Sequence, residues 1–235
     1  MASFASEKVK VYYWPAFGRA GAIFRMLEHV GQEYEHVSDF PSIANEASAF
    51  GASGDTFAPP ILVDGDFKLA QSTAVVQYVG VKAGLNNGVD QFKAAQYLAD
   101  IVDLFENGIN KSASQGGADL KTYLEGDGSD GPSRFAKQAS NLSRAIKGPF
   151  FFGDSPSYVD FFLCQHFEWN DATFLGRLEQ ETGKSFVKSY EKIIGVINGI
   201  QNLESYKNYS GPLKIFHSPD FCKPDEFFAE YKNAN

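Results

Sequence analysis

The stretch of residues 57–84 constrains the fold more than any other part of the chain. A double proline, Pro59-Pro60, precedes two short apolar runs that flank a turn at Asp64-Gly65, a pattern that predicts a β-hairpin. After Gln71-Ser72 the apolar residues recur on one face of a predicted helix, with Ser72 as its N-cap. The first turn of such a helix exposes N–H groups with partial positive charge, so a carboxylate can bind at this corner.

The residues before this stretch predict alternating strands and helices. A β-branched and aromatic run at residues 8–14 predicts a first strand, an apolar stripe at residues 19–30 predicts a helix, and residues 33–37 predict a second strand. Residues 38–56 are rich in Ala, Ser and Gly and are expected to form an irregular helix and a long loop. The resulting order, β-α-β-α-β-β-α, fits an α/β thioredoxin-like domain over residues 1–84.

The rest of the chain predicts helices alone. Residues 85–89 read as a linker, and residues 90–235 are expected to form an all-helical domain. Apolar residues recur with a helical period in four segments, namely residues 90–112, 134–147, 161–169 and 186–200. Ser157 and Asp160 lie three residues apart just before the third segment, which predicts a capping box.

Composition excludes several classes of function. The formal net charge of −8 over 235 residues argues against a nucleic-acid-binding surface. With only two cysteines, Cys164 and Cys222, a disulfide framework is not expected, and with neither a signal peptide nor a membrane-spanning run the chain is expected in the cytoplasm. The four histidines show no metal-ligand spacing, so no metal is expected. Cys164 lies in an apolar segment and is expected to be inert core.

Three motifs resemble the cytosolic glutathione transferases of the tyrosine-dependent type, closest to sigma and mu. They are the segment from Tyr13 to Ala20, the spacing from Pro60 to Gln71-Ser72, and the segment from Gly153 to Asp160. The resemblance implies a thioredoxin-like domain followed by an all-helical domain, a homodimer, and glutathione as co-substrate. It also implies that the glutathione thiolate is added to a small hydrophobic electrophile, with isomerase or peroxidase side activity.

The resemblance also assigns site residues. It implies that Tyr13 and Arg19 are catalytic, since a hydroxyl donor and a nearby cation both favour a thiolate over a thiol. The glutathione-binding residues that it implies are Tyr13, Trp14, Phe40, Pro59, Pro60, Gln71, Ser72 and Glu106. From the residues alone, a tyrosine in this place is more often a packed aromatic, and Arg19 can equally be a solvated residue of a first helical turn. The bond between Pro59 and Pro60 is predicted to be cis, with Ala58–Pro59 as the alternative.

Because of three departures from the family pattern, weaker binding of glutathione is expected. Pro59 has no N–H to give to the cysteinyl backbone. The family pattern has a tryptophan and a lysine that hold the glycine carboxylate of glutathione. Phe40 stands in place of the tryptophan, and Ala44 stands in place of the lysine. In the family pattern, an acidic residue on the first long helix reaches the glutathione of the neighbouring subunit. The best match to that position here is Glu106 or Asn107.

The second-substrate pocket is the least defined part of the site. Its expected walls are Phe17, Glu106, Asn110 and Phe216, each of which can also be an ordinary core or surface residue. The departures leave open an alternative function, a non-enzymatic binding or structural protein with the same fold. A thiol-redox enzyme is disfavoured because Tyr13, not a cysteine, stands at the end of the first strand.

Overall fold

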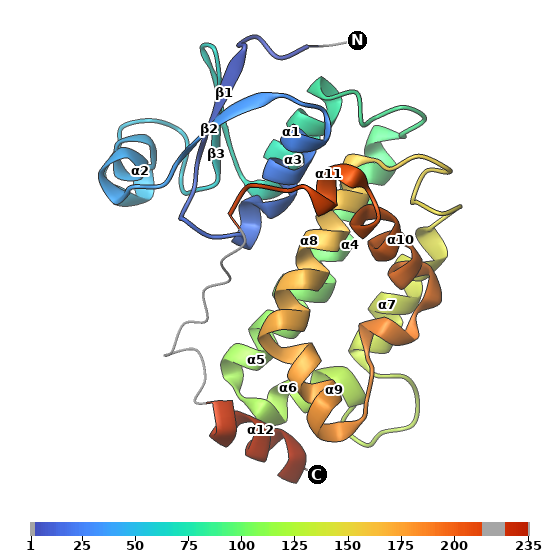
Figure 1. Ribbon diagram of the computed structural model, residues 1–235. Helices are drawn as coiled ribbons and strands as arrows, with labels where there is room; N and C mark the ends of the chain where they lie inside the picture. The colour runs from blue at the N-terminus through green and yellow to red at the C-terminus, as the bar shows by residue number, and fades with distance from the viewer. Residues whose placement is uncertain (1–2, 213–223, 235) are drawn as a thin grey trace.

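A computed structural model describes residues 3–212 and 224–234, and its first part is a four-stranded mixed sheet (Figure 1). The strands are β1 (Lys8–Tyr12), β2 (Glu33–Val37), β3 (Ile61–Asp64) and β4 (Phe67–Ala70), in the spatial order β2-β1-β3-β4. Strand β1 is parallel to β2 and antiparallel to β3, and β3 and β4 form the predicted antiparallel hairpin.

Three helices accompany the sheet. Helices α1 (Gly21–His29) and α3 (Ser72–Lys82) lie side by side on the face toward the helical part of the molecule, and α2 (Phe40–Glu46) lies on the opposite side (Figure 1). The apolar face of α1 is fully buried, because its stripe of Ile23, Phe24 and Leu27 packs into the core. Short 3-10 turns at Gly18–Ala20 and Ser48–Phe50 complete this part.

The remainder of the described chain is helical. Two of its segments, Phe105–Asn110 and Asp171–Leu175, are π-helical turns that continue α4 and α8, and Val187–Ser189 is a 3-10 turn. The helices are α4 (Gln91–Leu104), α5 (Lys111–Gln115), α6 (Gly117–Glu125), α7 (Arg134–Ala145), α8 (Tyr158–Asn170), α9 (Gly176–Thr182), α10 (Glu191–Gln201), α11 (Glu204–Lys207) and α12 (Pro224–Asn233). Among the described residues, no helix is long and apolar enough to cross a membrane.

Helix α8 is the centre of the helical part. All residues from Tyr158 to Phe167 are buried, as expected for a helix that is covered on every side (Figure 1). The predicted capping box is confirmed, since the Asp160 carboxylate accepts hydrogen bonds from the Ser157 N–H at 2.7 Å and the Ser157 hydroxyl at 2.6 Å. Cys164 is fully buried, which confirms its prediction as a core residue, and burial raises the pKa of its thiol well above the ordinary value.

Helix α8 also joins the two parts of the molecule. The side-chain oxygen of Gln165 accepts a hydrogen bond from the Ala22 N–H of α1 at 2.8 Å. Further along, Arg25 of α1 pairs with Glu168 at 2.9 Å, and its guanidinium lies 3.8 Å from the centre of the Tyr206 ring. Buried ion pairs fix geometry because each charge is costly without its partner. The orientation of α1, and of the loop before it, is therefore set by α8.

Three details of the sequence prediction are wrong. Ser72 is the first residue of α3 and not its N-cap, because β4 runs to Ala70 and the chain turns at Gln71. The single helix predicted at residues 90–112 is α4, a π-helical turn and the start of α5. The periodicity also missed α6, α9 and α12, which are short helices rich in polar residues. The two-domain division at residues 84 and 90 stays a prediction.

Candidate active site

Strand register brings the sequence-predicted site residues to one edge of the sheet. Tyr12, the last residue of β1, pairs with Val37 on one side and Ile61 on the other, and Ile61 pairs with Ala70. Tyr13 follows Tyr12, Gln71 follows Ala70, and Pro60 precedes Ile61 of the antiparallel strand, so all three lie along the same edge. Segments that are up to 58 positions apart in sequence meet there.

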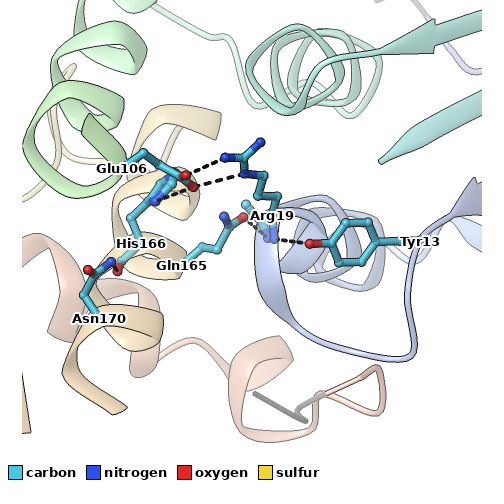
Figure 2. Close-up of polar contacts among 7 residues, drawn as sticks. Tyr13, Arg19, Glu106, Gln165, His166 and Asn170 are labelled. Atoms are coloured by element: carbon cyan, nitrogen blue, oxygen red, sulfur yellow. Dashed lines mark hydrogen bonds and ion pairs between the residues drawn. The ribbon is translucent and has the colours of Figure 1, made fainter. Parts of the chain in front are cut away.

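Tyr13 lies at the centre of this edge with its hydroxyl held from one side. The Arg19 N–H donates to the Tyr13 oxygen at 2.7 Å (Figure 2). Burial raises the pKa of Tyr13, while the Arg19 N–H and the Arg19 charge lower it and Glu106 raises it. The net rise keeps the phenol protonated near neutral pH. Because the phenol oxygen accepts the Arg19 N–H, its own O–H remains able to donate to a ligand.

The backbone around Tyr13 is shaped to leave room for its ring. Gly18 has φ +35°, and a Cβ atom there would lie 2.3 Å from the Tyr13 hydroxyl oxygen. On the other side, His36 Nε2 lies 2.9 Å from the Tyr13 carbonyl oxygen and 3.2 Å from that of Trp14. Both carbonyls can only accept, so this ring nitrogen donates. Sequence analysis missed His36, because no spacing links a mid-strand histidine to a neighbouring strand's end.

Arg19 and Glu106 form an ion pair at the site. Arg19 Nε lies 3.3 Å from Glu106 Oε1, and its second terminal nitrogen lies 2.6 Å from Oε2 (Figure 2). Burial alone would lower the pKa of Arg19, but its hydrogen bond and charge interaction with Glu106 raise it. Glu106 stands in the π-helical turn after α4, an irregularity that is frequent at functional sites. The Glu106 carboxylate thus faces Arg19 of its own chain.

Behind Glu106 lies a group of buried polar side chains from α8. His166 is 1% exposed, and its Nδ1 is 3.9 Å from Glu106 Oε1, too far for a hydrogen bond (Figure 2). Burial lowers the pKa of His166 to about 4, so the ring is neutral at pH 7. Within the described residues, both ring nitrogens, Gln165 Nε2 and Asn170 Oδ1 have no hydrogen-bond partner. Sequence analysis missed this group because α8 reads as apolar.

The corner at Pro59 to Ser72 has two unusual backbone features. The Pro59–Pro60 bond is cis, which confirms that prediction. Gln71 is exposed and has φ 73°, the only positive φ of a non-glycine residue in the described chain. Such a conformation costs about 1–3 kcal/mol and is most frequent at functional sites. No side chain caps the N-terminus of α3, so its first-turn N–H groups are open to a ligand.

An aromatic cluster forms the opposite end of the edge. The rings of Trp14 and Phe40 stack with centroids 6.4 Å apart and planes 8° apart. Phe50 packs edge-on against both, at 6.0 Å from Trp14 and 5.4 Å from Phe40. Phe40 and Phe50 remain 56% and 42% exposed. Trp14 and Phe40 of this cluster are sequence-predicted glutathione contacts. The third member, Phe50, was not predicted from the sequence.

The predicted walls of the second-substrate pocket stay a prediction, and the structure describes three of the four residues. Phe17 is 2% exposed and packs over Gly21 and the Arg25 guanidinium, so it supports the loop from within. Glu106 is paired with Arg19, and Asn110 is half-buried at the end of the π-helical turn. Phe216 lies outside the described residues. The described residues contain no group of three or more His, Cys, Asp or Glu side chains arranged to hold a metal ion.

Comparisons with known proteins agree on one family. No family model matches the chain. The chain is 25% identical over 226 residues to glutathione S-transferase Mu 2 of Macaca fascicularis, which covers 90% of this chain and 94% of that protein. It is 27% identical over 174 residues to a glutathione S-transferase of Tyrophagus putrescentiae, covering 68% of this chain and 74% of that one.

Solved structures support the same fold. A pi-class glutathione S-transferase of Onchocerca volvulus superposes with a TM-score of 0.63 at 17% identity, covering 86% of this chain and 91% of that one. The prostaglandin synthase D of Nilaparvata lugens superposes with a TM-score of 0.60 at 19% identity, covering 86% and 96%. The mixed sheet with its helices, the helical remainder and the named relatives lead to one conclusion. The chain is similar in sequence to glutathione S-transferases over most of its length and shares their fold.

Proposed function

We propose that this chain conjugates glutathione to small hydrophobic electrophiles, with Tyr13 activating the thiol, as an enzyme closest to the mu or sigma type. The observation that carries the proposal is the Tyr13 hydroxyl, which accepts the Arg19 N–H at 2.7 Å and keeps its proton for a ligand. The curated relatives compared above are all named glutathione S-transferases, which favours an enzyme over the non-enzymatic alternative.

The proposed pose places the glutathione sulfur at the Tyr13 hydroxyl. The γ-glutamyl end then points along the sheet edge to Gln71 and Ser72, where the uncapped start of α3 presents N–H groups to a carboxylate. The cysteinyl backbone lies beside Pro59 and Pro60, which the register puts between these two points. The strained backbone of Gln71 is consistent with a position that is fixed for binding.

The chemistry needs a shifted thiol pKa and little else. A free cysteine thiol has a pKa of about 8.5, so only a few per cent is thiolate at neutral pH. A hydrogen bond from the Tyr13 O–H favours the thiolate, and each unit of lowering corresponds to about 1.4 kcal/mol. Arg19 adds a cation whose charge is partly offset by Glu106. The same thiolate would serve isomerase or peroxidase side reactions.

We further propose that the chain forms a homodimer. Two aromatic side chains are far more exposed than core residues of their type, Phe57 at 63% and Phe92 at 90%. Exposed aromatic side chains of this kind are common at protein interfaces. In the proposed homodimer these two side chains pack against a second copy of the chain.

The proposed activity is tested by a conjugation assay. The purified protein, glutathione and a chlorodinitrobenzene acceptor are expected to give thioether product in proportion to enzyme concentration. Tyr13→Phe is expected to lower turnover with little change in glutathione affinity, because the lost interaction is made to the sulfur. Absence of turnover with several acceptors, together with no calorimetric binding of glutathione, would favour the non-enzymatic alternative.

A further inference from the structure

We propose that the end of the ligand site at α2 receives an uncharged group, so that this chain prefers a glutathione-type thiol whose terminal carboxylate is masked as an ester or amide. The inference rests on the proposed function, since it concerns the co-substrate of the same site. It is carried by the aromatic cluster of Trp14, Phe40 and Phe50 and by the distribution of charge around it.

The strand order determines which part of the ligand reaches this cluster. The order is β2-β1-β3-β4, so Tyr13 at the end of β1 lies between the start of α3, which follows β4, and the start of α2, which follows β2. A tripeptide with its thiol at Tyr13 and its γ-glutamyl end at α3 must direct its third residue the opposite way. That direction leads to Phe40, the first residue of α2, whose ring stacks on Trp14.

This end of the site offers an apolar surface. Phe40 and Phe50 keep 56% and 42% of their area exposed although they pack on each other and on Trp14. An ester or amide group can bury against aromatic rings at little cost, whereas a carboxylate without a charge partner loses its hydration there. The surface therefore favours an uncharged ligand end.

The charges nearby disfavour an anion. Residues 38–60 contain Asp39, Glu46 and Asp55 but no Lys, Arg or His. Glu46 of this segment is paired with Lys68 of β4. A carboxylate brought to α2 would therefore meet like charges without a free counter-ion on this segment.

The start of α2 is already capped by a carboxylate of the chain itself. The Asp39 side chain accepts the Ser42 N–H at 2.9 Å, Pro41 has no N–H, and the Ile43 N–H bonds the Asp39 carbonyl. The hydrogen bonds from Ser42 lower the pKa of Asp39, so the cap is an anion at neutral pH. In contrast, the start of α3 carries no side-chain cap. The two ends of the site thus differ, since the start of α3 is uncapped and the start of α2 is capped by the Asp39 carboxylate.

Calorimetric titration with glutathione and with its glycyl monoethyl ester tests the inference. Both ligands keep the thiol and the γ-glutamyl carboxylate, and at the third residue the ester replaces the carboxylate with an uncharged ethyl ester. The wild-type protein is expected to bind the ester more tightly than glutathione. Glutathione binding as tightly as the ester, or more tightly, would overturn the inference, since a carboxylate would then be accepted at this end as well as an uncharged group.

A matched pair of protein variants tests the same preference for an uncharged ligand end. Ala44 lies one helical turn after Phe40, on the same face of α2, and Asn45 is its exposed neighbour. Ala44→Lys is expected to tighten glutathione by about two- to fivefold and leave the ester unchanged, and Asn45→Lys is expected to change neither. Equal effects on both ligands, or from both variants, would count against the inference. If neither ligand binds the wild-type protein, the proposed function itself fails.

Discussion

At the scale of single residues, the site depends on how closely the backbone approaches Tyr13. The Arg19 N–H, the Gly18 backbone and the His36 ring surround its hydroxyl and its carbonyl group. The sequence predicts Tyr13 as a site residue through its motif and its place at the end of a strand. In the structure it lies at the same sheet edge as the other predicted site residues. It does not predict what holds the hydroxyl, because that depends on a main-chain N–H, which every residue except proline carries.

Substitution of Gly18 tests this close approach. In Gly18→Ala the new Cβ would lie 2.3 Å from the Tyr13 hydroxyl oxygen, so the ring must move. A shift of about 1 Å at a reacting group can cost about a hundredfold in rate, so conjugation is expected to fall by at least about tenfold. Gly31→Ala is the control, because Gly31 also has a positive φ, +69°, but nothing within 4 Å of its Cβ position. It is expected to lose about 1–2 kcal/mol of stability and keep its turnover. Equal turnover in the two variants would contradict this account of Gly18.

The charge of Glu106 is open to a second test at this scale. Glu106 raises the pKa of Tyr13 and pairs with Arg19, so its negative charge is expected to oppose a thiolate at the same place. Glu106→Gln should therefore lower the apparent pKa of bound glutathione, by about half a unit to one unit for a charge at the edge of a partly exposed site. Asp103→Asn, an exposed carboxylate one turn earlier on α4, is the control and should leave that pKa unchanged. A rise in the thiol pKa in Glu106→Gln would show that Glu106 acts mainly by holding Arg19 in place.

At the scale of elements, α8 shows what periodicity can and cannot predict. Its apolar residues and the Ser157–Asp160 cap predict a buried helix, and both are confirmed. Gln165, His166 and Glu168 look like interruptions of that pattern, yet they contact α1 or lie next to Glu106. The partners of these side chains lie more than 50 positions away, so a local period carries no information about them. The same limit explains the missed π-helical turn after α4.

The buried His166 predicts a pH-dependent stability. Burial lowers its pKa to about 4, below the value of about 6.5 in an unfolded chain. Between these values the unfolded state binds a proton that the folded state does not, so this contribution is complete above about pH 6.5 and is lost as pH falls toward 4. Relative to His166→Gln, the wild-type protein is expected to lose about 2–3 kcal/mol between pH 7 and 4.5.

Denaturant unfolding of both proteins at the two pH values measures this loss. Burial raises the pKa of Asp160 to about 6, which acts in the opposite direction over the same range. Asp160 is present in both proteins, so the difference between them isolates the histidine. A difference that does not change with pH would mean that His166 does not resist protonation in the folded state.

At the scale of the whole molecule, the fold was the most predictable feature. The strand and helix order of residues 1–84 and the helical remainder follow from hydrophobic periods and turn residues, and the family comparisons agree. The positions of Tyr13 and of Pro60 to Ser72 at one edge of the sheet were predictable from motifs. The surroundings of Phe17 and Glu106 were not predictable, because they are formed by segments that are distant in sequence and share no motif.

The proposed homodimer is the prediction that belongs to this scale. Light scattering after size exclusion is expected to give about twice the chain mass of 25.9 kDa. Phe92→Ser is expected to shift the protein toward the monomer, because Phe92, the most exposed aromatic side chain among the described residues, would lose its apolar contact. Lys93→Ser changes the adjacent exposed position and should leave the mass unchanged. A wild-type monomer at micromolar concentration would contradict the proposal.

The central claim is that the Tyr13 hydroxyl stabilises the thiolate of bound glutathione, and a thiol titration tests it most directly. Thiolate absorbance is followed against pH for glutathione bound to the wild-type protein and to Tyr13→Phe, with thermal unfolding to verify that both are folded. The wild-type complex is expected to titrate at least about one unit below the free thiol value of about 8.5, and the variant close to that value. The same apparent pKa in both complexes would contradict the assignment of Tyr13.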